Sequence, residues 1–145
     1  MLSINVRVSV DTRGLKRLQA NLKKLTPEVR REWNEAAVKE LAARLLQKVS
    51  ERTPTGKYLT GSGKVGGTLK RGWTVGEVTK TGDTYSIEVF NPVEYALYVE
   101  YGHRTRDHKG WVEGQFMLTI AIQELMADNE RILENRLTKL LSQYL

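Results

Sequence analysis

The fold is decided by one segment, residues 26–54, which reads TPEVRREWNEAAVKELAARLLQKVSERTP. Its apolar side chains recur every three or four residues and form one stripe, as in an amphipathic helix. The stripe consists of Val29, Trp33, Ala37, Val38, Leu41, Leu45 and Val49. The opening threonine can cap a helix and the proline after it suits the first helical position, whereas Thr53-Pro54 stops a helix. The pattern therefore predicts a long helix over about 27–51.

The residues before this helix alternate strictly between apolar and polar side chains over residues 2–10. This alternation is typical of a half-buried strand. Asp11 is placed to cap a short helix that follows, because leucines recur there at 3–4–3 spacing. These leucines are Leu15, Leu18, Leu22 and Leu25.

The middle of the chain predicts a loop, a hairpin and a short helix. Residues 52–68 contain five glycines without periodicity, which indicates a long loop. Residues 69–78 and 84–90 alternate as two strands, with Thr81-Gly82-Asp83 at the turn. The tyrosine-rich stretch 93–101 predicts a short helix, for which the next residue, a glycine, is a suitable C-cap.

The last third predicts a second charged loop over residues 102–114 and then a helical stripe that runs to the C-terminal end. We expect a bend or an interruption in that stripe at Ala127-Asp128-Asn129. The resulting fold class is α+β, with a small antiparallel sheet of the N-terminal strand plus a hairpin. This sheet would pack against the long central helix and the C-terminal helix, within one domain over residues 1–145.

Composition excludes several classes of protein. The chain has 145 residues, a formal net charge of +6 and no cysteine, so a disulfide framework, a thiolate zinc site and a cysteine nucleophile are excluded. No apolar run approaches the roughly 20 residues of a membrane span. The N-terminal residues lack the basic head and apolar block of a secretory signal. We therefore expect no membrane contact and no export by the usual route.

No catalytic, cofactor or metal site is predicted. Residues 61–66 match the letters of G-x-G-x-x-G, but the dinucleotide fingerprint needs a strand before it and a helix after it, and the order here is reversed. His103, Asp107, His108 and Glu113 lie close together in sequence, yet interleaved cations oppose a divalent ion. No serine lies in a nucleophile-elbow motif. We expect a protein that is not an enzyme.

The first loop and its exit are locally basic and lie near two aromatic residues, Tyr58 and Trp73. The cations are Arg52, Lys57, Lys64, Lys70 and Arg71. Such a segment could contact a DNA backbone, dock on an acidic neighbouring subunit, or remain a solvated loop. Tyr95, Tyr98 and Tyr101 suit either core packing or an interface, because each ring is apolar and ends in a polar hydroxyl.

Three segments resemble a family of phage proteins. Thr53-Pro54-Thr55-Gly56 followed by Leu69-Lys70-Arg71-Gly72-Trp73 resembles its threonine–glycine segment, with an extended glycine insertion. Residues 91–103, NPVEYALYVEYGH, resemble its Y-A-x-Y-V-E-F/Y-G block, and residues 114–118 resemble the start of its closing helix. The family is the minor tail proteins of tailed phages that complete the tail or join it to the head. Its relatives occur in defective prophages and phage-tail-like bacteriocins.

This resemblance implies a structural virion protein without catalytic residues. It implies a small subunit that forms a ring, expected to be a hexamer, at the head-proximal end of the tail. The implied partners are further copies of the chain, the tail terminator, the tail tube and sheath, and the head connector, with DNA passing through the lumen. The protein would be assembled in the host bacterial cytoplasm and reside in the tail or neck of the virion.

The stretch from His103 to Met117 is most similar to the contractile-tail branch, although many members have threonine where this chain has His103. We expect the contacts to lie on the two loops and the short helix. The candidate contact residues are Lys57, Tyr58, Lys64, Trp73, Tyr95, Tyr98, Glu100, His103, Arg104, Arg106, His108 and Trp111. Two alternatives stay open: a tail terminator that caps the tube and sheath, and a DNA-binding protein that uses the basic loop.

Overall fold

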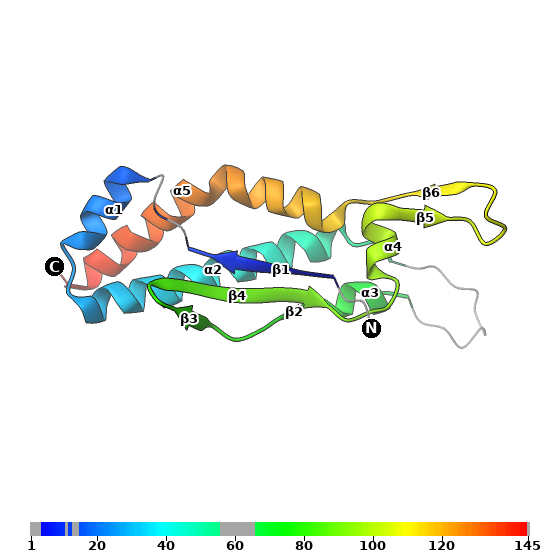
Figure 1. Cartoon of the computed structure of the whole chain (residues 1–145). Helices are drawn as coiled ribbons and strands as arrows, with labels where there is room; N and C mark the ends of the chain where they lie inside the picture. Colours follow the sequence, from blue (N-terminus) through cyan, green and yellow to red (C-terminus); the bar gives the residue numbers. More distant parts are fainter. Residues whose placement is uncertain (1–3, 11, 13–14, 56–65, 145) are drawn as a thin grey trace.

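The computed structural model describes residues 4–10, 12, 15–55 and 66–144 of the chain (Figure 1). The helices are α1 (Lys16–Lys23), α2 (Pro27–Arg52), α3 (Thr68–Arg71), α4 (Ala96–Tyr101) and α5 (Met117–Tyr144). The strands are β1 (Ile4–Ser9), β2 (Thr74–Val75), β3 (Thr79–Thr81), β4 (Thr84–Asn91), β5 (Gly102–Arg104) and β6 (Trp111–Glu113). A small antiparallel sheet covers α2, and α5 runs alongside α2, so the predicted α+β class is confirmed.

The central helix forms where the sequence predicts it. The Thr26 hydroxyl accepts a hydrogen bond from the Val29 amide at 3.3 Å, which satisfies one of the free donors in the first turn. Thr53 adopts an extended conformation and ends the helix before Pro54. Six of the seven stripe residues are buried, and Val29 lies partly buried at the edge of the core.

The main sheet has the strand order β1-β4-β2, and β3 also pairs with β4. β1 pairs with β4 along its whole length, from Ile4 opposite Asn91 to Ser9 opposite Ser86. The β3–β4 hairpin turns at Gly82, whose φ of +61° suits glycine. The N-terminal strand and the hairpin turn are therefore confirmed.

The expected strand over residues 69–78 is wrong for its first half. Residues 68–71 form the short helix α3, and β2 has only two residues. Leu69 is buried there, and its carbonyl accepts a hydrogen bond from the Asn91 side chain at 2.8 Å. Tertiary contact with the end of β4 thus overrides the local alternation of apolar and polar residues.

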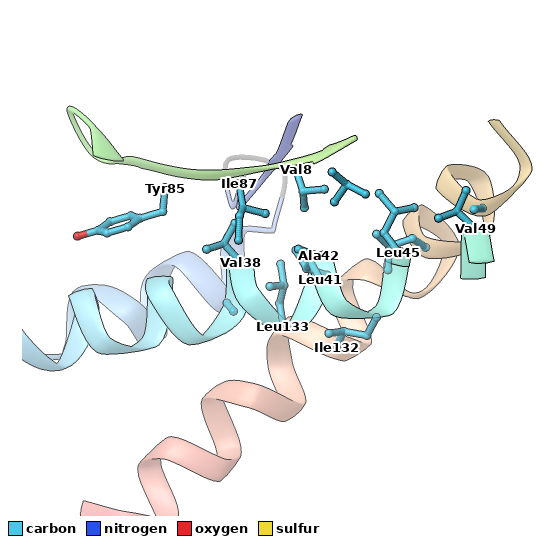
Figure 2. Close-up of a cluster of buried hydrophobic side chains, with 14 of the residues drawn as sticks. Val8, Val38, Leu41, Ala42, Leu45, Val49, Tyr85, Ile87, Ile132 and Leu133 are labelled. Carbon is cyan, nitrogen blue, oxygen red and sulfur yellow. The ribbon is translucent and has the colours of Figure 1, made fainter. Parts of the chain in front are cut away.

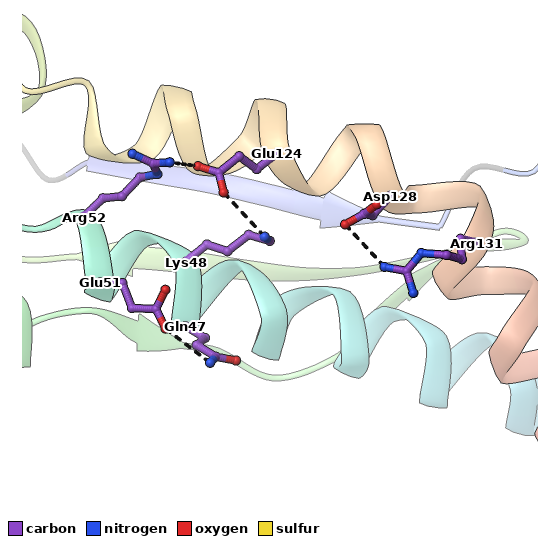
Figure 3. A network of polar contacts seen from close by, with 7 residues as sticks. All are labelled: Gln47, Lys48, Glu51, Arg52, Glu124, Asp128 and Arg131. Carbon is purple, nitrogen blue, oxygen red and sulfur yellow. Dashed lines mark hydrogen bonds and ion pairs between the residues drawn. The ribbon is translucent and has the colours of Figure 1, made fainter.

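The C-terminal helix is continuous, so of the two expected alternatives at residues 127–129 the interruption is wrong. The other alternative, a bend, agrees with the change of direction that Figure 1 shows along the helix. Asp128 pairs with Arg131 at 3.3 Å within the helix (Figure 3). Ile132 and Leu133, just beyond, are both buried. Packing therefore keeps the helix intact through a stretch whose composition alone favours a break.

Ion pairs join α5 to α2 on the exposed side of their contact (Figure 3). Glu124 pairs with Arg52 and, at 3.5 Å, with Lys48. Glu40 pairs with Arg136 at 3.7 Å further along the same two helices. Such partly exposed pairs add little stability individually, so the main energy comes from the apolar contact beneath them.

That apolar core lies between the sheet and the two long helices (Figure 2). Val8 and Ile87 face it from the sheet, Leu45 from α2, and Leu133 from α5. Burying each such side chain contributes about 1.5–3 kcal/mol.

Two further expectations need correction. Asp11 lies outside the described residues, and α1 begins only at Lys16, where Leu15 occupies the N-cap position. Just before this helix, the Leu15 amide donates to the Thr12 carbonyl at 2.9 Å. Residues 102–114 are not a simple loop but a β-hairpin, in which β5 pairs with β6.

Candidate functional site

Exposed apolar side chains gather at one end of the molecule. Seven large hydrophobic side chains are exposed in the described part of the chain, and six of them lie between residues 95 and 116. These six are Tyr95, Tyr98, Tyr101, Trp111, Val112 and Phe116. We call them the aromatic end; they lie at the start of and along α4, on β6 and just before α5 (Figure 1). Exposed apolar side chains gathered at one end of a molecule are typical of interaction surfaces.

The backbone beneath the aromatic end is tightly held at Asn91, which is fully buried. Its side-chain amide donates to the Leu69 carbonyl, and its side-chain oxygen accepts a hydrogen bond from the Val93 amide at 3.1 Å. A Cβ atom on Gly72 would collide with this same side chain. Asn91 therefore fixes the path from β4 into α4 and binds that path to α3.

Glu100 holds α4 to the start of α5. Its carboxylate is fully buried and accepts hydrogen bonds from the amides of Leu118 and Thr119 at 2.8 and 2.9 Å. The Thr119 hydroxyl donates to the same carboxylate at 2.6 Å. A carboxylate at this position satisfies free amides of the first helical turn and interacts favourably with the helix dipole.

Two glycines let the chain cross itself at the base of the β5–β6 hairpin. Gly102 has a φ of +86°, and a Cβ there would lie 2.5 Å from the Val112 carbonyl oxygen. A Cβ on Gly114 would collide with the Glu100 carbonyl oxygen. The Gln115 amide donates to the Val99 carbonyl at 2.7 Å, which closes the crossing. The hairpin is thus clamped where it leaves the body.

The tip of the hairpin is also ordered by hydrogen bonds. The Thr105 amide donates to the Gly110 carbonyl at 3.0 Å, and the Thr105 hydroxyl donates to the Asp107 carboxylate at 2.6 Å. The Lys109 amide donates to the same carboxylate at 3.0 Å. The hydrogen bond from the Thr105 hydroxyl, and to a smaller extent that from the Lys109 amide, lowers the pKa of Asp107 below its ordinary value.

The two faces of the hairpin differ in composition. Arg104 lies opposite Trp111 in the register, so both lie on one face. His103 lies opposite Val112 on the other face, and its ring centroid is 5.5 Å from that of Tyr98. Tryptophan, tyrosine and arginine are the side chains that dominate binding energy at protein interfaces.

The structure brings most of the predicted contact residues to this end. Those that are exposed or partly exposed are Tyr95, Tyr98, His103, Arg104, Arg106, His108 and Trp111. Trp73 and Glu100 are buried, and the Trp73 indole donates to the Thr53 hydroxyl at 2.8 Å. Neither of these two side chains is on the surface of the chain. Lys57, Tyr58 and Lys64 lie outside the described residues.

Sequence reasoning missed Val112 and Phe116 as members of the surface and did not single out Glu94, which is exposed beside Tyr95. No sequence signal indicated that residues 102–104 pair with residues 111–113, because each strand has only three residues. Within the described ranges, no three His, Asp or Glu side chains lie close enough to hold a metal ion. None of the described helices is long and apolar enough to cross a membrane.

The α+β body therefore presents an end that is rich in exposed aromatic side chains. The family model described as "Bacteriophage HK97-gp10, putative tail-component" matches residues 16–102, which is more than half of the chain. The chain belongs to this family of phage tail components, whose members are structural parts of the virion. Neither the curated proteins nor the solved structures gave a match. The family range includes α4 and ends at the first residue of the β5–β6 hairpin.

Proposed function

We propose that this chain forms a ring at the head-proximal end of a phage or phage-like tail, where it completes the tail and joins it to the head. The observation that carries the proposal is the aromatic end, which is apolar, exposed and built on a fixed backbone. A preorganised surface loses little conformational entropy on binding, so less of the favourable contact energy is offset by the cost of ordering. Its neighbours would be further copies, the tail tube or sheath, the tail terminator and the head connector.

The proposal treats the whole chain as one unit. The matched range holds most of the sheet and α2, whereas α5 lies beyond it and packs on α2 through Ile132 and Leu133. A fragment limited to residues 16–102 would therefore leave the α5-facing side of α2 uncovered. This favours a single domain over residues 1–145.

Electron microscopy of particles made with and without the gene tests the proposed role. We expect that loss of the gene leaves complete tails that fail to join heads, or necks without their collar. Tails of abnormal length would instead favour the terminator, which caps the tube and sheath. Particles unchanged by the loss would contradict both structural roles.

The DNA-binding alternative is less well supported by the basic loop. Arg52 is paired with Glu124, and the Arg71 guanidinium donates to the Gly66 carbonyl at 3.0 Å, so both cations have partners within the fold. Lys70 is exposed. Binding of the purified chain to duplex DNA at several salt concentrations separates the alternatives. A steep fall of affinity with salt would indicate a phosphate-contacting role, whereas the proposed role predicts only weak, non-specific binding.

A further inference from the structure

The aromatic end carries both a projecting side chain and a hollow. Trp111 stands 56% exposed on the β5–β6 hairpin, which leads away from the body (Figure 1). A hollow of about 220 Å³ lies at the foot of the same end, between the start of α3, α4 and the residues after α2. It is lined by Pro54, Thr55, Gly67, Thr68, Leu69, Tyr95 and Val99. Trp111 does not line this hollow in its own chain.

The charges beside the two features are opposite. Arg104 lies directly across the hairpin from Trp111, and Glu94 is the residue before Tyr95, which lines the hollow. Both side chains are exposed, and neither has a hydrogen-bond or ion-pair partner among the residues that the structure describes. A second copy that placed its indole in the hollow would bring a guanidinium to a free carboxylate. Complementary charges of this kind fix the partner and its register.

A two-stranded ribbon with both edges open is only marginally stable by itself in water. Here the ribbon is held at its base by the glycine crossing and at its tip by the Thr105 hydrogen bonds, but Trp111 and Val112 remain 56% and 43% exposed. Burial of the Trp111 side chain against a neighbouring copy would remove this apolar surface from water. Because the projection and the hollow are different patches, the contact is heterologous, and repetition of such a contact closes a ring when the rotation permits.

We propose that the chain self-associates head to tail, with Trp111 of one copy in the hollow formed by Tyr95, Val99 and Leu69 of the next, and with Arg104 paired to Glu94 across the contact. This inference rests on the proposed ring and adds the residues that close it. The partner is a second copy of the chain, recognised through one indole ring and one ion pair.

The first test measures self-association of the purified full chain by sedimentation velocity over a range of concentrations. We expect a closed oligomer for the unchanged chain and, for Trp111→Ala, about 30-fold weaker association, since buried tryptophans are typical interface hot spots. Met126→Ala is the matched control, because Met126 is an exposed apolar side chain on α5, away from the hairpin. Circular dichroism checks that each variant is folded. Equal association of Trp111→Ala and the unchanged chain would overturn the inference.

The second test exchanges the two charges. Arg104→Glu and Glu94→Arg should each weaken association by about tenfold through like-charge repulsion, and the double variant should recover to within about threefold of the unchanged chain. A double variant as weak as either single one would overturn the proposed pairing.

The outcomes separate this inference from the proposed function. An oligomer that forms regardless of Trp111 and of the charge exchange rejects the docking and leaves the virion role in place. A chain that stays monomeric at its highest soluble concentration also rejects self-docking, and another protein or nucleic acid then becomes the partner of the hairpin. Normal particles after loss of the gene reject the proposed function itself.

Discussion

The body and the aromatic end of this molecule are held together by different kinds of interaction. In the body, the side chains that face inward from α2, α5 and the sheet are apolar and buried (Figure 2). At the aromatic end, large apolar side chains face outward, and the backbone is held by Asn91, by Glu100 and by two glycines at a crossing. Hydrogen bonds of buried polar side chains, rather than packing of the aromatic rings, thus hold the backbone of the aromatic end. The rings themselves therefore stay exposed.

The body should therefore respond most strongly to loss of apolar volume. Leu45 is 1% exposed, so we expect Leu45→Ala to lower the free energy of unfolding by about 3–4 kcal/mol through lost burial and a residual cavity. Urea denaturation followed by circular dichroism measures this. Met126→Ala, at an exposed position on α5, should change the same quantity by less than about 0.5 kcal/mol. Equal effects of the two substitutions would contradict the assignment of the core.

The aromatic end should respond to loss of its buried carboxylate. We expect Glu100→Ala to cost about 3 kcal/mol, because the amides of Leu118 and Thr119 would lose their acceptor in a buried site. Glu94→Ala, six residues earlier and exposed, should be nearly neutral for unfolding. If Glu100→Ala proved as mild as Glu94→Ala, the clamp between α4 and α5 would not be what holds this end.

Substitution at the glycine crossing should lower the free energy of unfolding by an intermediate amount. Gly102→Ala places a side chain at a φ of +86° and against the Val112 carbonyl, so we expect a loss of about 2 kcal/mol. Gly82→Ala is the control, since Gly82 also has a positive φ but nothing within 4 Å of its Cβ position. Thermal or urea unfolding should rank Gly102→Ala as the more harmful of the two, and the reverse order would show that the crossing is not sterically tight.

The smallest expected effect is the pH-dependent stabilisation of the tip of the β5–β6 hairpin by Asp107. Since the Thr105 hydroxyl and the Lys109 amide hold the pKa of Asp107 below its ordinary value, this carboxylate stabilises the tip at pH values above that ordinary pKa. The contribution is lost as the pH falls through the lowered pKa. An NMR titration of the Asp107 carboxyl should show this low midpoint, and Thr105→Val should move it upward. A midpoint unchanged by Thr105→Val would remove the hydroxyl as its cause.

The body could be predicted from sequence far better than the aromatic end. The stripe of α2, with Thr26 and Pro27 at its start, and the alternation of β1 are long enough to reveal their period. By contrast, β5 and β6 have three residues each, and their pairing depends on Gly102 and Gly114 crossing in space. A strand of that length shows no usable alternation, so a loop was the natural expectation.

Glu100 shows a second limit of sequence reasoning. On a six-residue helix with tyrosines on several faces, the sequence does not reveal which side faces the body. The carboxylate is turned inward by amides that lie 18 and 19 residues further along the chain. Only tertiary structure could separate this anchor from the exposed tyrosines around it.

The most direct test of the central claim is a complementation assay with the triple variant Tyr98→Ala/Tyr101→Ala/Trp111→Ala, scored by electron microscopy as the fraction of heads joined to tails. All three side chains are more than half exposed, so the variant should fold with an unfolding free energy close to that of the unchanged chain. We predict that it folds and yet fails to restore joined particles, whereas Met126→Ala restores them. A triple variant that restores joined particles in full would contradict the claim that the aromatic end is the assembly surface.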